Sequence, residues 1–327
     1  GSSAASDVYK RQPREVEGFA DLNSKARLVE VWGQWQACLN EEQRAITCCD
    51  PPALANSMPE LERQLSEGQG LARRFMVIKA PFGGAGRQAI RCEKEGLNAK
   101  QRAWCERILR TQKNLVVEPW HHRLIDLSYL FEVRPDGKPK EVALTRFVTD
   151  NRGNYRGTMV GPAGAELESE IAHFFHRAGG QSWILKACRA VASRFAQDAQ
   201  ARGYQGPVGI DLMVIRDHHG DLKLRLPLEF NVRYTMGHVA IAAGNPLGSQ
   251  HRGLFWLFSA ADLRASGIPS YPALAARLRD DAAIRCIPLA EASEAKHLWP
   301  CLLSAKRATH VLGALGEMGL NVGSPSG

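Results

Sequence analysis

The sequence predicts an α+β fold, and two observations carry this prediction. Candidate helices and strands follow one another without the strict strand–helix–strand rhythm of a doubly wound sheet. Two strands, over residues 208–215 and 222–232, are joined by the short turn RDHHGD, which predicts an antiparallel hairpin. With 327 residues the chain is long enough for two or three domains with sizeable cores.

For the first part of the chain, the sequence predicts several helices and two short strands. Residues 14–45 carry Leu28, Val31, Trp32 and Trp35 at helical spacing. The elements that follow are a helix opening at Pro59, a strand over 75–79, a helix over 97–109 and a strand over 115–118.

The remaining elements alternate between β-rich and helical stretches. In order, we expect strands between 124 and 148 with a turn at RPDGKP, a helix over 166–178, a helix over 182–201 with Gly203 after it, the hairpin, and then a tail with a helix near 271–279, strands near 284–289 and 298–304, and a helix near 307–318.

The composition is that of a globular protein, with 44% hydrophobic and 23% charged residues. No apolar run approaches the ~18 residues of a membrane span, and the N-terminus shows no signal-peptide core. Eight cysteines are scattered without a CxxC pair, which favours a reducing compartment. We therefore expect a cytoplasmic protein with no membrane partner.

The net charge of +8 raises the alternative of a nucleic-acid binder. No Lys/Arg block or RNA-binding signature appears. A basic excess equally suits a cleft for phosphates and carboxylates. We expect no nucleic-acid partner; steeply salt-dependent binding to nucleic acid would support that alternative.

The second strand of the hairpin, LPLEFNVR, carries Glu229, Asn231 and Arg233 on one face, because strand residues two apart point the same way. Asp211 interrupts the apolar first strand, VGIDLMVI, and the hairpin places it beside this trio. Two carboxylates and an amide oxygen are the hard ligands that hold Mg²⁺. The alternative is a half-exposed sheet with a surface ion pair, and the carboxylate within an apolar strand favours the metal site.

A second motif, FMVIKAPFGGAGRQ, places Lys79 at the end of a strand and Gly83, Gly84 and Gly86 in the loop after it. Glycines let backbone N–H groups approach phosphate oxygens, and lysine reaches a phosphate as a point charge. The motif matches neither the Walker A pattern nor the dinucleotide fingerprint. The alternative is a simple glycine-rich turn.

In their order along the chain, these elements resemble the ATP-grasp superfamily over about residues 20–245. The resemblance implies two α+β subdomains that grip ATP, with a reduced or absent N-terminal α/β domain, because few residues precede Lys25. It implies these parts: a mostly helical N-terminal segment (1–70), a small subdomain with the glycine loop (71–120), a large subdomain with the Mg²⁺ and phosphate site (121–248) and a small α+β C-terminal extension (249–327).

The resemblance also implies roles for individual residues. The expected metal ligands are Asp211, Glu229 and Asn231. The expected nucleotide contacts are Lys25, Lys79, Gly83, Gly84, Gly86, Glu118 at the adenine pocket, the backbone of Trp120, and Asp126 at the ribose. Arg233 matches the arginine that steadies the transferred phosphoryl group.

The activity that the resemblance implies is an ATP- and Mg²⁺-dependent carboxylate–amine ligase, nearest to the pheganomycin-type peptide ligases. A small-molecule or peptide carboxylate becomes an acyl phosphate, which an amine then attacks. Arg146 and Arg156, in LTRFVTDNRGNYRGTMVG, are candidate substrate contacts; the alternative is solvated loop arginines. Homodimers are common among such proteins.

Two other activities fit the same motifs. One is a phosphotransferase of the same fold with a hydroxyl acceptor, and the other is a non-catalytic nucleotide-binding protein. The intact set of metal ligands disfavours the second.

Several His and Cys pairs are explained more simply by structure than by chemistry. His173-x-x-His176 lacks further zinc ligands nearby in sequence. The others are the turn pairs His121-His122 and His218-His219 and the vicinal pair Cys48-Cys49.

Overall fold

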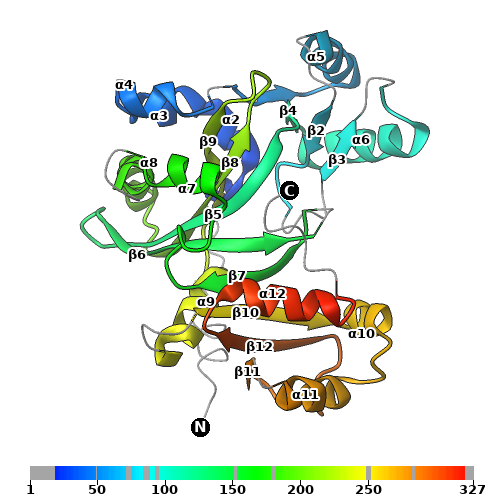
Figure 1. Cartoon of the computed structure of the whole chain (residues 1–327). Helices are drawn as coiled ribbons and strands as arrows, with labels where there is room; N and C mark the ends of the chain where they lie inside the picture. The colour runs from blue at the N-terminus through cyan, green and yellow to red at the C-terminus, as the bar shows by residue number, and fades with distance from the viewer. Residues whose placement is uncertain are drawn as a thin grey trace.

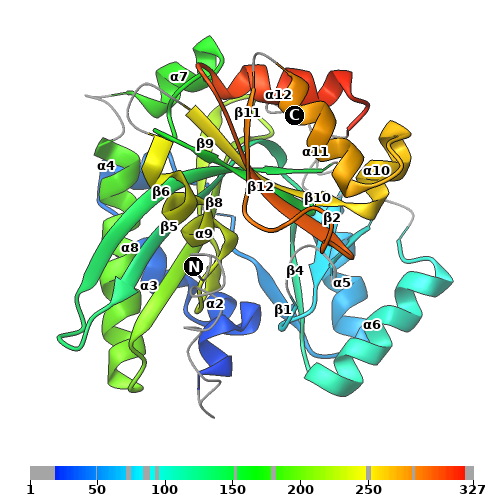
Figure 2. The ribbon, with the colours of Figure 1, turned by 90° about the horizontal axis from the view of Figure 1, so that it is seen from below.

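Two β-sheets with helices on their outer faces make up the structure, a computed structural model (Figure 1). It describes residues 19–48, 50–70, 75–83, 89–92, 96–150, 153–177, 182–247, 252–281 and 284–320. Figure 2 shows the small sheet and its helices α5 and α6 beside the strands and helices of the larger part.

The small sheet has four strands in the order β1-β4-β2-β3, and all neighbours are antiparallel. Its elements are β1 (Ala53–Ala55), α5 (Met58–Gly70), β2 (Met76–Lys79), β3 (Ala89–Cys92), α6 (Ala99–Gln112) and β4 (Leu115–Pro119). Leu61 from α5 and Ile108 from α6 pack against Ile78 in a shared core. Strand β4 is buried at every position, so its polar residue, Glu118, also lies inside the protein.

The large sheet has eight strands in the order β11-β12-β10-β7-β6-β5-β8-β9. Its central strands and their helices are β5 (His122–Val133), β6 (Pro139–Thr149), β7 (Tyr155–Val160), α7 (Ser169–Phe175), α8 (Ser182–Ala201), β8 (Gly206–Arg216), β9 (Leu222–Asn231), α9 (Met236–Gly244) and η2 (Asn245–Leu247). Helix α8 buries Ile184, Val191 and Phe195 against this sheet. No helix in the described part of the chain has the length and apolar character that crossing a bilayer requires.

Short N-terminal helices complete the core of the large sheet. They are η1 (Ala20–Asn23), α2 (Lys25–Glu30), α3 (Trp32–Ala37) and α4 (Glu41–Ala45). The Trp35 ring lies 5.1 Å from the Phe230 ring, between centroids, so α3 packs on β9. The continuous helix that the spacing over 14–45 suggests is instead broken at Val31, which leaves helical geometry with φ −105° and ψ 14°.

The C-terminal part continues the large sheet. It contains β10 (Arg252–Ser259), α10 (Ala260–Ser266), α11 (Tyr271–Asp280), β11 (Arg285–Pro288), β12 (Leu298–Ala305) and α12 (Ala308–Glu317). Strand β10 pairs with β7, and Trp256 and Trp299 lie in a second core that also contains Val148 of β6 and Met159 of β7. The boundary expected near 248 thus separates neither two sheets nor two cores, because one sheet and one core continue across it.

The boundary expected near residue 70 also differs from the structure. Strand β1 pairs with β4, and α5 packs on the small sheet, so residues 53–70 belong to that sheet and not to the N-terminal helical segment. The sequence prediction missed β1 because a three-residue strand has no periodicity to detect.

The predicted hairpin is present, with Asp211 directly opposite Glu229. The register shifts beyond Asp211, and Leu228 lies at this irregularity. Leu226 and Phe230 lie in the core of the large sheet, whereas Leu228 packs with Met213 and Ile215. The strict alternation expected from LPLEFNVR is therefore wrong at Leu228.

Candidate functional site

A cavity of about 330 Å³ lies between the two sheets and is lined by both. The small sheet supplies Val77, Lys79 and Glu118, and the large sheet supplies Asp126, Met213, Leu228 and Glu229. Lys25, at the start of α2, and Gly83 also line the cavity. The volume is in the range of small-ligand pockets.

Two lysines and two glutamates form ion pairs at this cavity. Lys25 Nζ donates to Glu229 Oε1 at 2.8 Å and to the Gly83 carbonyl at 2.7 Å. The Lys79 ammonium contacts Glu118, which also accepts from Arg225 Nη2 at 3.4 Å. Burial lowers the pKa of Lys79 to about 7, against the opposing attraction of Glu229. A bound anion would favour the charged form of Lys79, which suits a phosphate group.

The three predicted metal ligands lie together on β8 and β9. Asn231 Nδ2 donates to Asp211 Oδ2 at 2.9 Å, and Asn231 Oδ1 accepts from Arg233 Nη2 at 3.0 Å. Burial, and next the neighbouring Glu229, raise the pKa of Asp211 to about 7. The neighbouring carboxylates of Asp211 and Glu229 repel each other when both are ionised. With the amide oxygen of Asn231 beside them, they suit a divalent cation that prefers oxygen ligands.

We expect Asp211→Asn to stabilise the ligand-free chain at about pH 8. The folded-state pKa of Asp211 is above its ordinary value of 3.8, so stability falls as the pH rises from there to about 7. Above that window the ionised Asp211 carboxylate lowers the stability by the full amount, about 4 kcal/mol for a pKa raised from 3.8 to about 7, and Asp211→Asn removes this cost, which is a gain in the free energy of unfolding. Denaturant titrations across pH measure this gain. If the gain in the free energy of unfolding of Asp211→Asn stays constant as the pH is lowered, the prediction is wrong.

Asp126 and Trp120 also line the cavity. Asp126 Oδ2 accepts from Thr149 Oγ1 at 3.0 Å and lies 3.4 Å from Arg123 Nη1, and burial raises its pKa. The Trp120 side chain is 41% exposed, but its backbone N–H donates to the Phe75 carbonyl at 3.1 Å. The Trp120 N–H is therefore engaged within the small sheet, and an adenine contact from the Trp120 backbone stays a prediction.

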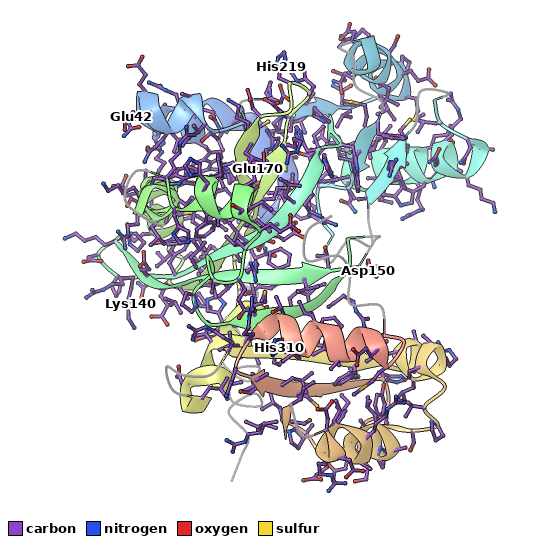
Figure 3. All side chains as sticks on the ribbon, in the orientation of Figure 1. Glu42, Lys140, Asp150, Glu170, His219 and His310 are labelled. Carbon is purple, nitrogen blue, oxygen red and sulfur yellow. The ribbon has the colours of Figure 1, made fainter. Side chains whose placement is uncertain are left out.

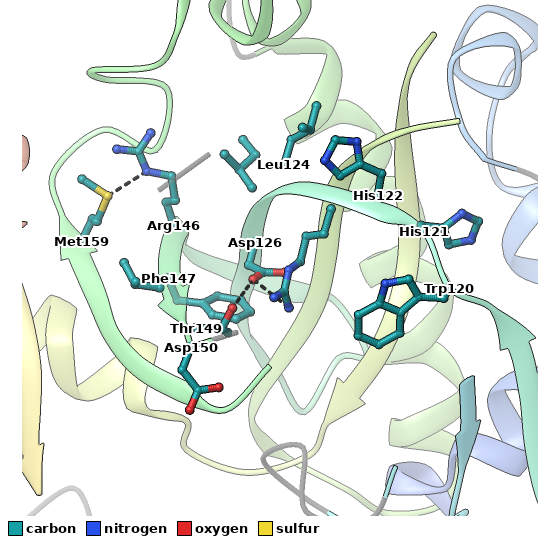
Figure 4. A pocket seen from close by; sticks show the side chains of 13 residues that line it. Trp120, His121, His122, Leu124, Asp126, Arg146, Phe147, Thr149, Asp150 and Met159 are labelled. Atoms are coloured by element: carbon teal, nitrogen blue, oxygen red, sulfur yellow. Dashed lines mark hydrogen bonds and ion pairs between the residues drawn. The ribbon is translucent and has the colours of Figure 1, made fainter. Parts of the chain in front are cut away.

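A second cavity, of about 190 Å³, adjoins the first and shares Asp126 and Trp120 with it (Figure 4). Arg146 lines it, is 5% exposed, and donates from Nε to Met159 Sδ at 2.7 Å. Among the described residues, no carboxylate lies within 4 Å of its guanidinium nitrogens. Burial lowers the pKa of Arg146 to about 10, so it stays charged at neutral pH. A buried guanidinium beside a cavity makes Arg146 a candidate contact for an anion, because buried charges require partners.

Arg156 lies elsewhere. Its Nη2 donates to Asp262 Oδ1 at 2.5 Å, and its guanidinium lies 5.0 Å from the Trp256 ring centroid. These contacts tie β7 to α10, and Arg156 lines neither of the two cavities, so the structure does not bring it together with the other predicted site residues. Gly84 and Gly86 lie outside the described residues.

Arg225 lines neither cavity but contacts Glu118, and the sequence interpretation did not single it out. It is 1% exposed, contacts the Asp50 carbonyl and Glu118, and stacks 4.4 Å from the Trp32 ring centroid. The signal was present, because Arg225 falls in the same alternating register as Glu229 and Asn231.

No protein-family model and no curated protein sequence matches this chain. Solved structures match its fold at low sequence identity. An N5-carboxyaminoimidazole synthase from Aspergillus clavatus, in complex with ADP and 5-aminoimidazole ribonucleotide, is 13% identical with a TM-score of 0.53, over 96% of this chain and 78% of that one.

Two further structures are carboxylases. A biotin carboxylase from Campylobacter jejuni, in an ATP-type complex, is 13% identical with a TM-score of 0.54, over 89% of this chain and 64% of that one. The biotin carboxylase domain dimer of a Hydrogenobacter thermophilus 2-oxoglutarate carboxylase, with MgADP and bicarbonate, is 15% identical with a TM-score of 0.50, over 86% and 62%. The predicted α+β, ATP-grasp fold is thereby confirmed.

Proposed function

We propose that this chain is an ATP- and Mg²⁺-dependent ligase that activates a carboxylate as an acyl phosphate and joins it to an amine. One observation carries the proposal: cations and carboxylates from both sheets converge on a single cavity. Glu229 lines this cavity, Asp211 lies opposite Glu229 on the neighbouring strand, and Asn231 donates to Asp211. The fold shared with enzymes solved with ADP or an ATP-type ligand supports it.

The cavity suggests how a nucleotide would lie. The apolar side chains Met213 and Leu228 offer a surface for the base, and Lys25 and Lys79 offer positive charge to the phosphates. Asp211, Glu229 and Asn231 would hold Mg²⁺, which neutralises charge on the transferring phosphoryl group. Arg233, bonded to Asn231, lies beside this set and would stabilise the same charge.

The second cavity is the proposed site for the carboxylate that receives the phosphoryl group. Arg146 is its buried cation, and the cavity adjoins the nucleotide cavity through Asp126 and Trp120. Neighbouring placement of the two reactants accounts for much of the rate gain in such a transfer. The carboxylate and amine are small molecules or peptides, as in pheganomycin-type peptide ligases.

Trapping with hydroxylamine tests the reaction. The chain is incubated with ATP, Mg²⁺ and a panel of carboxylates, and ADP and hydroxamate are measured together. We expect hydroxamate to form in step with ADP for at least one carboxylate. ADP formation with a phosphorylated hydroxyl product and no hydroxamate would show a phosphotransferase, and nucleotide binding without turnover would show a binding protein.

Arg146→Met should raise KM for the carboxylate by about tenfold or more, because a charge-assisted hydrogen bond is lost. Nucleotide affinity should stay unchanged, because Arg146 lines the second cavity and not the first. Steady-state ADP release and calorimetry with nucleotide measure the two effects.

The fold should tolerate Arg146→Met, because no carboxylate among the described residues loses a partner. Arg189→Met, which removes an exposed arginine paired with Glu141, is the control and should leave KM unchanged. If Arg146→Met has the same KM for the carboxylate as the parent chain, then Arg146 does not bind the carboxylate.

A further inference from the structure

We propose that Cys48, Asp50 and His121 bind a divalent metal ion of the zinc class at the link between the two sheets. One ligand atom from each residue lies within 4.8 Å of the other two. Cys48 Sγ lies 4.0 Å from His121 Nε2. These residues are separate from the proposed Mg²⁺ ligands, and Cys49 lies outside the described residues.

The ligand types select the metal. A thiolate, an imidazole and a carboxylate suit zinc, whereas magnesium and calcium prefer oxygen ligands alone. Zinc bonds of about 2.3 Å to sulfur and 2.0 Å to nitrogen place those two atoms roughly 3.6 Å apart in a tetrahedral site. The observed 4.0 Å needs only a small side-chain adjustment. Three protein ligands leave a fourth position for water.

The backbone around these ligands is held by its own contacts. Cys48 N donates to the Leu224 carbonyl at 2.9 Å, which fixes the segment after α4 on β9. Arg225 contacts the Asp50 carbonyl. Next to His121, Trp120 N donates to the Phe75 carbonyl at 3.1 Å. Ligands that are positioned before the metal arrives lose less freedom on binding it.

The nearby charge does not oppose a cation strongly. Arg225, which contacts the Asp50 carbonyl, is paired with Glu118 at 3.4 Å, and this carboxylate offsets its charge. Cys48 is buried among Met213 and Ile215, so the metal must displace a thiol proton in an apolar setting. Binding should therefore weaken as the pH falls.

The proposed metal site lies at the link between the small sheet and the large sheet. Strand β4 ends at Pro119 and β5 begins at His122, so His121 lies in the link that joins the small sheet to the large one. Cys48 is fixed to the large sheet through β9. A metal bound by both residues would tie this link to the large sheet and restrict movement of the small sheet.

Cobalt(II) titration of the metal-free full chain, without nucleotide or magnesium, tests the proposal. We expect one cobalt per chain, with a sulfur-to-cobalt charge-transfer band and the visible absorption of a tetrahedral site, both removed by zinc. Cys48→Ser should lose the charge-transfer band. Asp50→Asn and His121→Ala should weaken binding by about 100-fold or more, since even indirect partners of a metal contribute 10–100-fold.

Cys38→Ser is the matched control, because Cys38 is a thiol outside any disulfide and donates to the Gln34 carbonyl at 3.2 Å. It should keep the band and the affinity. Absence of a sulfur band in the parent chain, its survival in Cys48→Ser, or unchanged affinity in both Asp50→Asn and His121→Ala would overturn the proposal. If Cys48→Ser does not fold, Asp50→Asn carries the test. Because no ATP is present, these outcomes are independent of the ligase proposal.

Discussion

Glu229→Gln should reduce ATP turnover by about 1000-fold or more, because it removes a charged metal ligand at the point of phosphoryl transfer. The fold should persist. The amide oxygen can still accept from Lys25, and Lys25 keeps its bond to the Gly83 carbonyl at 2.7 Å. ADP release measures turnover, and thermal unfolding measures the fold.

The control for this variant is Glu132→Gln, which removes a carboxylate from a surface pair with Lys140. Its turnover should match that of the parent chain. If Glu229→Gln turned over ATP within about tenfold of the parent, the metal assignment on β8 and β9 would be wrong.

Lys79→Ala should weaken nucleotide binding by about 100-fold, because a buried, charge-assisted contact to phosphate is lost. Glu118 keeps Arg225 as a partner, so the variant does not leave that carboxylate without a cation. Isothermal calorimetry with ADP and Mg²⁺ measures the affinity.

Lys140→Ala is the matched control, since Lys140 lies on the β5–β6 hairpin at the edge of the molecule (Figure 3). Its affinity for nucleotide should equal that of the parent chain. Equal affinity in Lys79→Ala would show that the lysine serves only the ion pair with Glu118.

The sequence predicted the hairpin well, for a physical reason. Side chains alternate strictly along a strand, and a glycine turn sets two strands antiparallel, so Asp211 and Glu229 were expected side by side. The register shift near Leu228 was not predictable, because it depends on how the strands pair and not on their composition.

Contacts between distant segments were also beyond the sequence pattern. The pairing of Arg156 with Asp262 depends on β10 joining β7, and β10 is an apolar run that shows no alternation. Likewise, the vicinal pairs of His and Cys looked incidental until folding placed Cys48 near His121. The spacing of apolar residues predicts individual helices and strands, whereas contacts between residues distant in sequence depend on tertiary packing.

The ion pair between Lys25 and Glu229 spans 204 positions of the chain. Closing so distant a contact requires most of the intervening polypeptide to be arranged beforehand. During synthesis, the cavity therefore cannot be completed until the second hairpin strand has left the ribosome. Nucleotide should protect full-length chains from proteolysis but give no protection to nascent chains that stop before residue 229.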